Sequence, residues 1–218
     1  MTDYYKQSLE LLRTILLENH YDFWANWLSE DIEKWDKNRD TEHHIRAYGG
    51  MGSFNDIVIG NQDIVGLWQG AVFGQLQSLA YSLAKGENLN TIIERIGVNS
   101  TQISGWRCQN CATARLTNLD IERFLRDNTL PQIFIKLIKD NQLADILNIE
   151  SIINNSEVQQ KRVALEKLIT ETNIEISSDT TWLWSCPKCG SNETCTYRWN
   201  LLENGTTLIE ASDNLPIK

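Results

Sequence analysis

The chain has 218 residues, 41% of them hydrophobic, which is enough for one large core or two small ones. It has 20 lysine and arginine residues against 29 aspartate and glutamate residues, and the formal net charge is −9. An acidic surface repels phosphate backbones and anionic lipids, which disfavours a general nucleic-acid-binding or membrane-surface protein. No basic segment followed by an apolar run opens the chain, and no run approaches the roughly 18 apolar residues of a membrane helix. We therefore expect a cytoplasmic protein without a membrane segment.

The first part of the chain, 1–88, is predicted to be a helical domain. Apolar residues recur at helical spacing in 4–19, 21–35 and 62–85, with Gly86 as a stop signal after the last of them. Three tryptophans share one face of the second segment. Asp31 falls within the same face and is the one position there that is not expected to meet a core.

A glycine-rich segment, RAYGGMGSFNDIVIG at 46–60, interrupts this helical pattern. A short helix that begins at Asp40 or Thr41 is expected to end in this segment, and the last part of the segment, 57–59, is expected to be an apolar, extended stretch. As a binding turn for an anion it would use the following residues: Gly49, Gly50, Gly52, Ser53, Asn55 and Asp56. It matches no known phosphate-binding motif, and an acidic side chain in the turn opposes a phosphate. The alternative is a helix end, a tight turn and a new helix cap.

Two adjacent histidines, His43 and His44, precede this turn. Neighbouring residues on a short helix point in different directions, so the pair does not form a nucleophile–base arrangement with Ser53. We expect surface histidines, and no catalytic motif is recognised elsewhere in the chain. The sequence accordingly predicts a protein that is not an enzyme.

The rest of the chain, 89–218, is predicted to be a second domain in which a small β-sheet carries a helical insertion at 118–173. A connector at 87–104 leads into it, and the insertion is expected to use Pro131 in a first helical turn and a capping box at 156–159. The expected strands are 102–107, 112–116, 180–184, 194–201 and 206–212, and Glu-Asn-Gly links the last two as a hairpin. The predicted fold class is therefore α+β.

Four of the five cysteines form two C-x-x-C pairs, Cys108 with Cys111 in GWRCQNC and Cys186 with Cys189 in LWSCPKCG. Two such turns supply the four thiolates of a tetrahedral site, so the sequence predicts one structural Zn²⁺ per chain. A redox dithiol normally lies in a βαβ setting, which is absent here. A catalytic zinc needs an open coordination position, which four thiolates do not leave. The fifth cysteine, Cys195, is expected to be a small buried residue.

These two motifs resemble the knuckles of a four-cysteine zinc ribbon, split by the helical insertion. The resemblance covers 105–118 and 180–212, and it implies a zinc-stabilised β-sheet. Ala112 departs from it, because glycine is common at that position. Basic residues interleaved with aromatic ones surround the knuckles, as in some nucleic-acid-binding ribbons: Arg107, Arg115, Lys188 and Arg198.

The segment 21–85 is similar to a bacterial family of uncharacterised domains that share a G-x-G-S-F-N-D-type turn between helices. That resemblance implies a small bacterial cytoplasmic module and transfers no catalytic residues. Together with the acidic charge, it leads us to expect a non-enzymatic interaction protein of the immunity or antitoxin type. Its partner would be a protein, such as a toxin with a basic surface. The alternative is a zinc-ribbon factor associated with nucleic acid.

Overall fold

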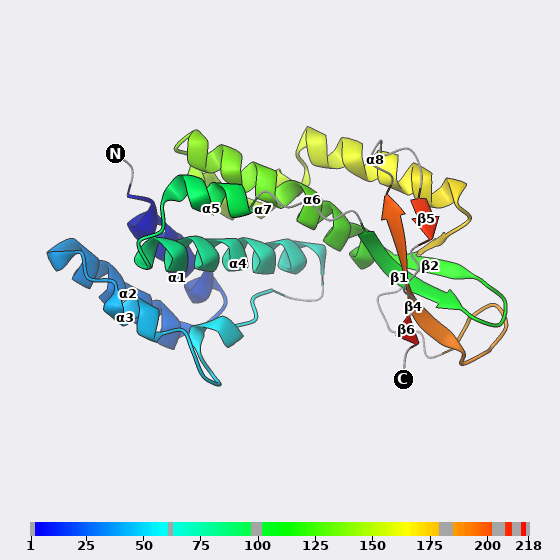
Figure 1. The fold of residues 1–218 in the computed structure, drawn as a ribbon, viewed down its shortest axis with the longest axis horizontal. Helices are drawn as coiled ribbons and strands as arrows, with labels where there is room; N and C mark the ends of the chain where they lie inside the picture. The colour runs from blue at the N-terminus through cyan, green and yellow to red at the C-terminus, as the bar shows by residue number, and fades with distance from the viewer. Residues whose placement is uncertain are drawn as a thin grey trace. The chain divides into compact units, whose positions relative to one another are not determined.

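The computed structural model describes residues 3–60, 63–96, 102–178, 185–201, 208–210 and 215–216. It confirms the predicted α+β class, with helices first along the chain and a small sheet formed mainly after them (Figure 1). Its contacts define two compact units. Unit 1 comprises Met1–Val98 and Leu130–Ile153, and unit 2 comprises Asn99–Thr129 and Asn154–Lys218. The predicted insertion, 118–173, is thus shared between the units. The domains predicted at 1–88 and 89–218 remain a prediction, because contacts do not test independent folding.

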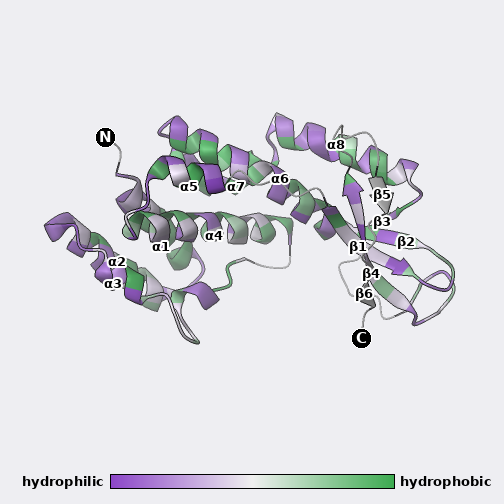
Figure 2. Ribbon diagram, in the orientation of Figure 1, coloured by the Kyte–Doolittle hydropathy of each residue, from purple (hydrophilic) through white to green (hydrophobic). Residues whose placement is uncertain are grey.

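Unit 1 is helical. Its elements are α1 (Tyr4–Glu18), α2 (Asp22–Asn38), α3 (Glu42–Arg46), the 3₁₀ turn η1 (Phe54–Asp56), α4 (Ile64–Ala84), α5 (Leu89–Ile96), the last part of α6 (Asn118–Lys139), η2 (Leu143–Leu147) and α7 (Ile149–Ile153). Helix α1 packs against both α2 and α4. Hydrophobic colours predominate along α4 and hydrophilic ones along α2 (Figure 2). This agrees with a central position of α4 and a peripheral position of α2 in unit 1. The three long helices predicted from periodicity are confirmed.

The structure tests four local predictions in and around the helices. The connector predicted at 87–104 contains α5, which begins beside Asn88, whose side chain accepts a hydrogen bond from the N–H of Asn90. The apolar stretch at 57–59 lies outside any helix, and the backbone of Ile57 is extended, as predicted. Pro131 lies inside α6 rather than in a first turn, although proline cannot donate the helical hydrogen bond there. Helix α8 is capped by Asn155 instead of by the predicted box one residue later.

Asp3 caps α1 and joins it to α2. Its carboxylate accepts hydrogen bonds from the N–H of Lys6 (3.1 Å), from Trp35 Nε1 (2.7 Å) and from Arg39 Nη1 (2.8 Å). Partial burial raises the pKa of Asp3, but these hydrogen bonds, that of Trp35 foremost, outweigh the burial and hold the pKa below 3.8. The ionised carboxylate therefore stabilises the folded state.

We expect Asp3→Ala to lower the free energy of unfolding by about 1–2 kcal/mol at neutral pH, as for the loss of a helix cap. A lowered pKa in the folded state stabilises the fold above the unfolded-state pKa, and this stabilisation is lost as the pH falls through the folded-state value. The difference between wild type and variant, measured by denaturant titration, should therefore shrink as the pH falls below about 4. A difference that grows on acidification would contradict this role of Asp3.

Unit 2 contains the sheet. Its elements are β1 (Gln102–Cys108), β2 (Ala114–Thr117), the first part of α6, α8 (Ser156–Glu171), β3 (Glu175–Ser177), β4 (Thr194–Leu201), β5 (Leu208–Glu210) and β6 (Leu215–Pro216). The order is β3-β2-β1-β4-β5, and β6 also pairs with β4. Strands β1, β2, β4 and β5 confirm four predictions, whereas the strand predicted at 180–184 and the Glu-Asn-Gly turn lie outside the described residues.

The helical insertion is a crossover between two neighbouring parallel strands. Strand β2 pairs in parallel with β3, which follows the last helix of the insertion, and parallel neighbours require a long connection. At the start of this crossover Thr117 and Asp120 form a capping box on α6. Further along, the buried Glu122 of α6 pairs with Arg162 of α8, whose Nη2 donates to Glu122 Oε2 at 3.2 Å. The insertion is therefore the connection that the parallel strands β2 and β3 require.

The longest pairing of the sheet, between β1 and β4, leads directly to the cysteines. The strands are antiparallel, and their register places Cys108 opposite Thr194 at the sheet end where both cysteine turns lie. Gly105 in β1 allows a close approach, because a Cβ there would meet the carbonyl oxygen of Arg115 at 2.5 Å. On β4, the side chains of Tyr197 and Trp199 are buried. In the described part of the chain, no helix combines the length and the apolar character needed to cross a membrane.

Candidate functional site

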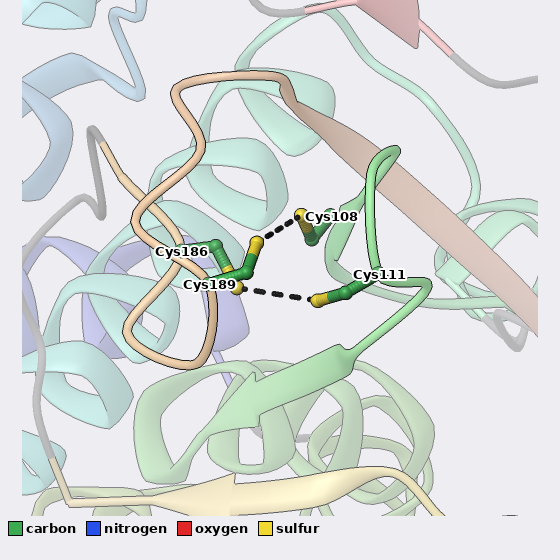
Figure 3. A group of neighbouring side chains, drawn as sticks. All are labelled: Cys108, Cys111, Cys186 and Cys189. Carbon is green, nitrogen blue, oxygen red and sulfur yellow. Dashed lines mark hydrogen bonds between the residues drawn. The ribbon is translucent and has the colours of Figure 1, made fainter.

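The four cysteines of the two C-x-x-C motifs come together, as the sequence predicts. Their sulfur atoms all lie within 4.8 Å of one another, and the side chains point towards a common centre (Figure 3). Cys108 Sγ is 3.6 Å from Cys189 Sγ, and Cys111 Sγ is 3.6 Å from Cys186 Sγ. Cys108 is the last residue of β1 and Cys111 follows it, whereas the second pair precedes β4. Each short distance therefore joins one motif to the other.

The backbone shapes both motifs in the same way. In the first, the N–H of Cys108 donates to the carbonyl of Thr113 (2.9 Å), and the N–H of Ala112 donates back to the carbonyl of Cys108 (3.0 Å). In the second, the N–H of Cys186 donates to the carbonyl of Ser191, and the N–H of Gly190 donates to the carbonyl of Cys186, both at 2.8 Å. Two segments far apart in the sequence thus form the same turn, with both sulfurs of each turn on one side.

The residue after each motif has a left-handed backbone. Gly190 has φ +72° and Ala112 has φ +58°. The departure from glycine at Ala112 therefore leaves the turn geometry unchanged, although a Cβ makes this conformation less favourable. The second turn uses the residue type that this conformation favours.

The sulfur positions fit a tetrahedral metal. Four sulfurs about 2.3 Å from a central zinc are about 3.8 Å apart, which is close to the two shortest separations in the cluster. Cys108 and Cys186 are buried, whereas Cys189 is exposed. Soft thiolates in a tetrahedron favour zinc or iron–sulfur chemistry over the hard cations magnesium and calcium. In the described part of the chain, no other group of histidine, cysteine and acidic side chains converges in this way.

The protein environment makes one of the thiols acidic. A hydrogen bond from the side chain of Thr113, whose Oγ1 lies 3.2 Å from Cys111 Sγ, lowers the pKa of Cys111 to about 6. At Cys108 the N–H of Cys111 stabilises the thiolate, but burial and the neighbouring thiols outweigh it and raise the pKa to about 11. A cation at the centre would favour the thiolate form of all four cysteines.

Three other residues singled out around the knuckles have internal contacts, whereas Lys188 is exposed. Cys195 is buried outside the cluster, with its Sγ 3.6 Å from the carbonyl oxygen of Arg107. The guanidinium of Arg107 lies 5.1 Å from the centre of the Tyr197 ring, and Arg115 donates to the hydroxyl of Ser177. These two arginines therefore contribute to the packing of unit 2.

A second cluster of ionisable groups lies inside unit 1, and the sequence analysis missed it. The side chains of Asp31 and His44 are 1% and 0% exposed, so the predictions that Asp31 avoids the core and that His44 lies on the surface are wrong, whereas the side chain of His43 is 17% exposed. His43 Nδ1 lies 2.5 Å and His44 Nδ1 3.0 Å from separate oxygens of the Asp31 carboxylate. Trp27 stacks on His43 with ring centres 4.2 Å apart. Both histidines point to one carboxylate because it lies between them on the neighbouring helix.

The glycine-rich turn consists of a tight turn followed by the capped 3₁₀ turn η1. Gly49, Gly50 and Gly52 all have positive φ, as a tight turn requires. Asp56 accepts a hydrogen bond from the N–H of Ser53 at 3.0 Å, which confirms the predicted capping box at the start of η1. The remaining candidate, Asn55, has an exposed side chain.

Beside this turn lies an open pocket of about 470 Å³. The residues that line it are Tyr48, Gly49, Asn55, Gly74, Gln77, Ser78 and Tyr81. Two of the six residues proposed for a binding turn therefore meet a cavity, and the others are not among its lining residues. Tyr48 and four residues of α4 complete the lining, and they could not be predicted because no local motif marks them.

Comparison with known proteins gives one partial match. A family model described as a domain of unknown function, DUF6966, matches residues 17–65, which span α2, α3 and the glycine-rich turn. No curated protein and no solved structure matches the chain. The matched segment includes Asp31, the two histidines and Tyr48, and it does not include the cysteines.

Proposed function

We propose that the four cysteines bind one structural Zn²⁺ per chain. The observation that carries this proposal is the pair of matching turns, which bring four sulfurs together at separations close to those of a zinc tetrahedron. Zinc is a metal that this donor set of four thiolates favours. Four protein thiolates complete its coordination and leave no position for water, so the metal's role is to stabilise the sheet.

The proposal predicts close to one zinc per purified chain by elemental mass spectrometry. The double variant Cys108→Ser/Cys189→Ser should lose it, because it removes one ligand from each turn. Cys195→Ser is the matched control, since Cys195 is buried nearby without belonging to the cluster, and it should retain the metal. Wild-type protein that folds without zinc, or a double variant that still holds one equivalent, would contradict the assignment.

For the protein as a whole we propose a non-enzymatic role in binding another protein, of the immunity or antitoxin type. The acidic excess supports a cationic partner, and most of it lies in unit 1, which also contains the family match. Affinity purification from the source bacterium, followed by mass spectrometry, tests this role. Recovery of one basic protein, bound more weakly at high salt, supports it. Recovery of nucleic acid alone would favour the alternative of a nucleic-acid-associated factor and overturn the proposal.

A further inference from the structure

The pocket beside the glycine-rich turn has the chemistry of a ligand site. It belongs entirely to unit 1, and its volume lies within the range of small-molecule sites. We propose that it binds a small neutral carbohydrate, either a free monosaccharide or the end of a glycan, and that Tyr48 is a binding residue positioned by His44 and Asp31. This site is independent of the cysteines and goes beyond the proposed function.

The lining selects against charged ligands. None of the seven residues that line the pocket carries a charge. Among these residues, a phosphate or carboxylate ligand would find no cationic partner, and a metal ion would find no carboxylate. The polar groups are a hydroxyl at Ser78 and amides at Asn55 and Gln77, and Nε2 of Gln77 already donates to the carbonyl oxygen of Phe54 at 2.8 Å. Such groups both donate and accept hydrogen bonds, which suits the hydroxyls of a sugar.

Two tyrosine rings supply the apolar part of the wall. Tyr48 and Tyr81 contact each other, with ring centres 4.6 Å apart and planes inclined by 48°. A planar base therefore cannot insert between the two rings, and the C–H face of a sugar needs only one ring surface. The two rings thus supply the apolar surface that a sugar ring requires.

A buried chain of hydrogen bonds orients the Tyr48 hydroxyl. His44 Nδ1 lies 3.0 Å from a carboxylate oxygen of Asp31, and His44 Nε2 lies 3.3 Å from Tyr48 OH. The phenol donates to the carbonyl oxygen of Gln77 at 3.4 Å, so two partners hold the Tyr48 hydroxyl in place at the pocket wall. Burial raises the pKa of Tyr48, which keeps this hydroxyl protonated. The contacts from Asp31 through His44 thus position Tyr48 as a residue of the pocket wall.

Gly74 is an independent indication that the pocket accommodates a ligand. Glycine disfavours the middle of a helix relative to other residues, so a glycine inside α4 needs a reason. Gly70 has a packing reason, because a Cβ there would meet the carbonyl oxygen of Ile59 at 2.6 Å. A Cβ at Gly74 would meet nothing within 4 Å, and Gly74 lines the pocket. Its missing side chain leaves the pocket open without serving the packing of the fold.

The experiment is a titration of the full chain with D-glucose, D-galactose, D-mannose and N-acetyl-D-glucosamine, followed by backbone amide shifts in NMR spectra. At least one sugar should shift the signals of Asn55 and Ser78 in a saturable way. Gly74→Leu should abolish this binding by filling the pocket, and Val65→Leu, which adds a larger side chain at an exposed position on the same helix, should retain it. Tyr48→Phe should weaken binding about fivefold while keeping the ring.

Melting curves separate lost binding from lost folding. Gly74→Leu should melt no lower than wild type, since leucine favours a helix more than glycine does. The proposal is overturned if none of the four sugars shifts these signals at millimolar concentration. It is also overturned if a folded Gly74→Leu variant binds like wild type, or if adenosine or inorganic phosphate binds more tightly than every sugar.

Discussion

Replacement of Cys186 by serine is expected to unfold the β-sheet of unit 2 while unit 1 keeps its helices. Binding of a structural zinc contributes about 10–16 kcal/mol in small zinc domains, which matches or exceeds the total stability of a typical domain. The cysteine turns connect directly to β1 and β4, the longest pairing in the sheet. Loss of the metal should therefore remove the dispersed amide signals of both strands in NMR spectra. A metal chelator should give the same result with the wild-type chain.

The matched control for this experiment is Cys195→Ser. This substitution also replaces a buried sulfur in unit 2 with a hydroxyl, but it leaves the four cysteines of the cluster in place. We expect a cost of about 1–3 kcal/mol, the penalty for a poorly satisfied buried polar group, with the sheet still formed. If Cys186→Ser melted at the wild-type temperature, the cysteines would not hold a structural metal.

Asp31→Ala is expected to be the most damaging single substitution in unit 1, lowering the free energy of unfolding by about 3–5 kcal/mol. The carboxylate is buried and is within hydrogen-bonding distance of His43 and His44. Alanine would leave His44, which is fully buried, without its partner at Nδ1. Denaturant unfolding followed by circular dichroism measures the change.

Asp36→Ala on the same helix is the comparison for Asp31→Ala. The side chain of Asp36 is 50% exposed and pairs only with Lys6 in the described part of the structure, so its removal should cost no more than about 1 kcal/mol. Asp31→Asn should fall between the two, because the amide keeps one acceptor oxygen for a histidine. Equal effects of Asp31→Ala and Asp36→Ala would show that the buried cluster contributes nothing to stability.

The metal centre could be predicted from the sequence because its signal is local. Each C-x-x-C motif contains the residues that form its own turn, and two copies imply one four-thiolate site. The fold class was predictable for the same reason, since periodicity marks the long helices and alternation marks β1 and β4. Strand β3 was missed, because three residues paired in parallel with β2 leave too short a pattern to recognise.

The features that could not be predicted depend on contacts between segments far apart in the sequence. Asp31 was assigned to the surface because an amphipathic pattern treats a charged residue as solvated, and the histidines that make its burial favourable lie on another helix. The pocket joins 48–55 to 74–81. The glycine-rich turn indicated the first of these segments, whereas the second contains no binding motif, and its only sign is Gly74, a residue that weakens the interior of a predicted helix.

X-ray absorption at the zinc edge is the most direct test of the central claim that four cysteines bind one structural zinc. The measurement reports the element, the number of ligands and their distance in the intact chain. We predict a single shell of four sulfur atoms about 2.3 Å from zinc, with no nitrogen or oxygen ligand. A shell with a water or histidine ligand, or protein that folds without metal, would contradict the structural assignment.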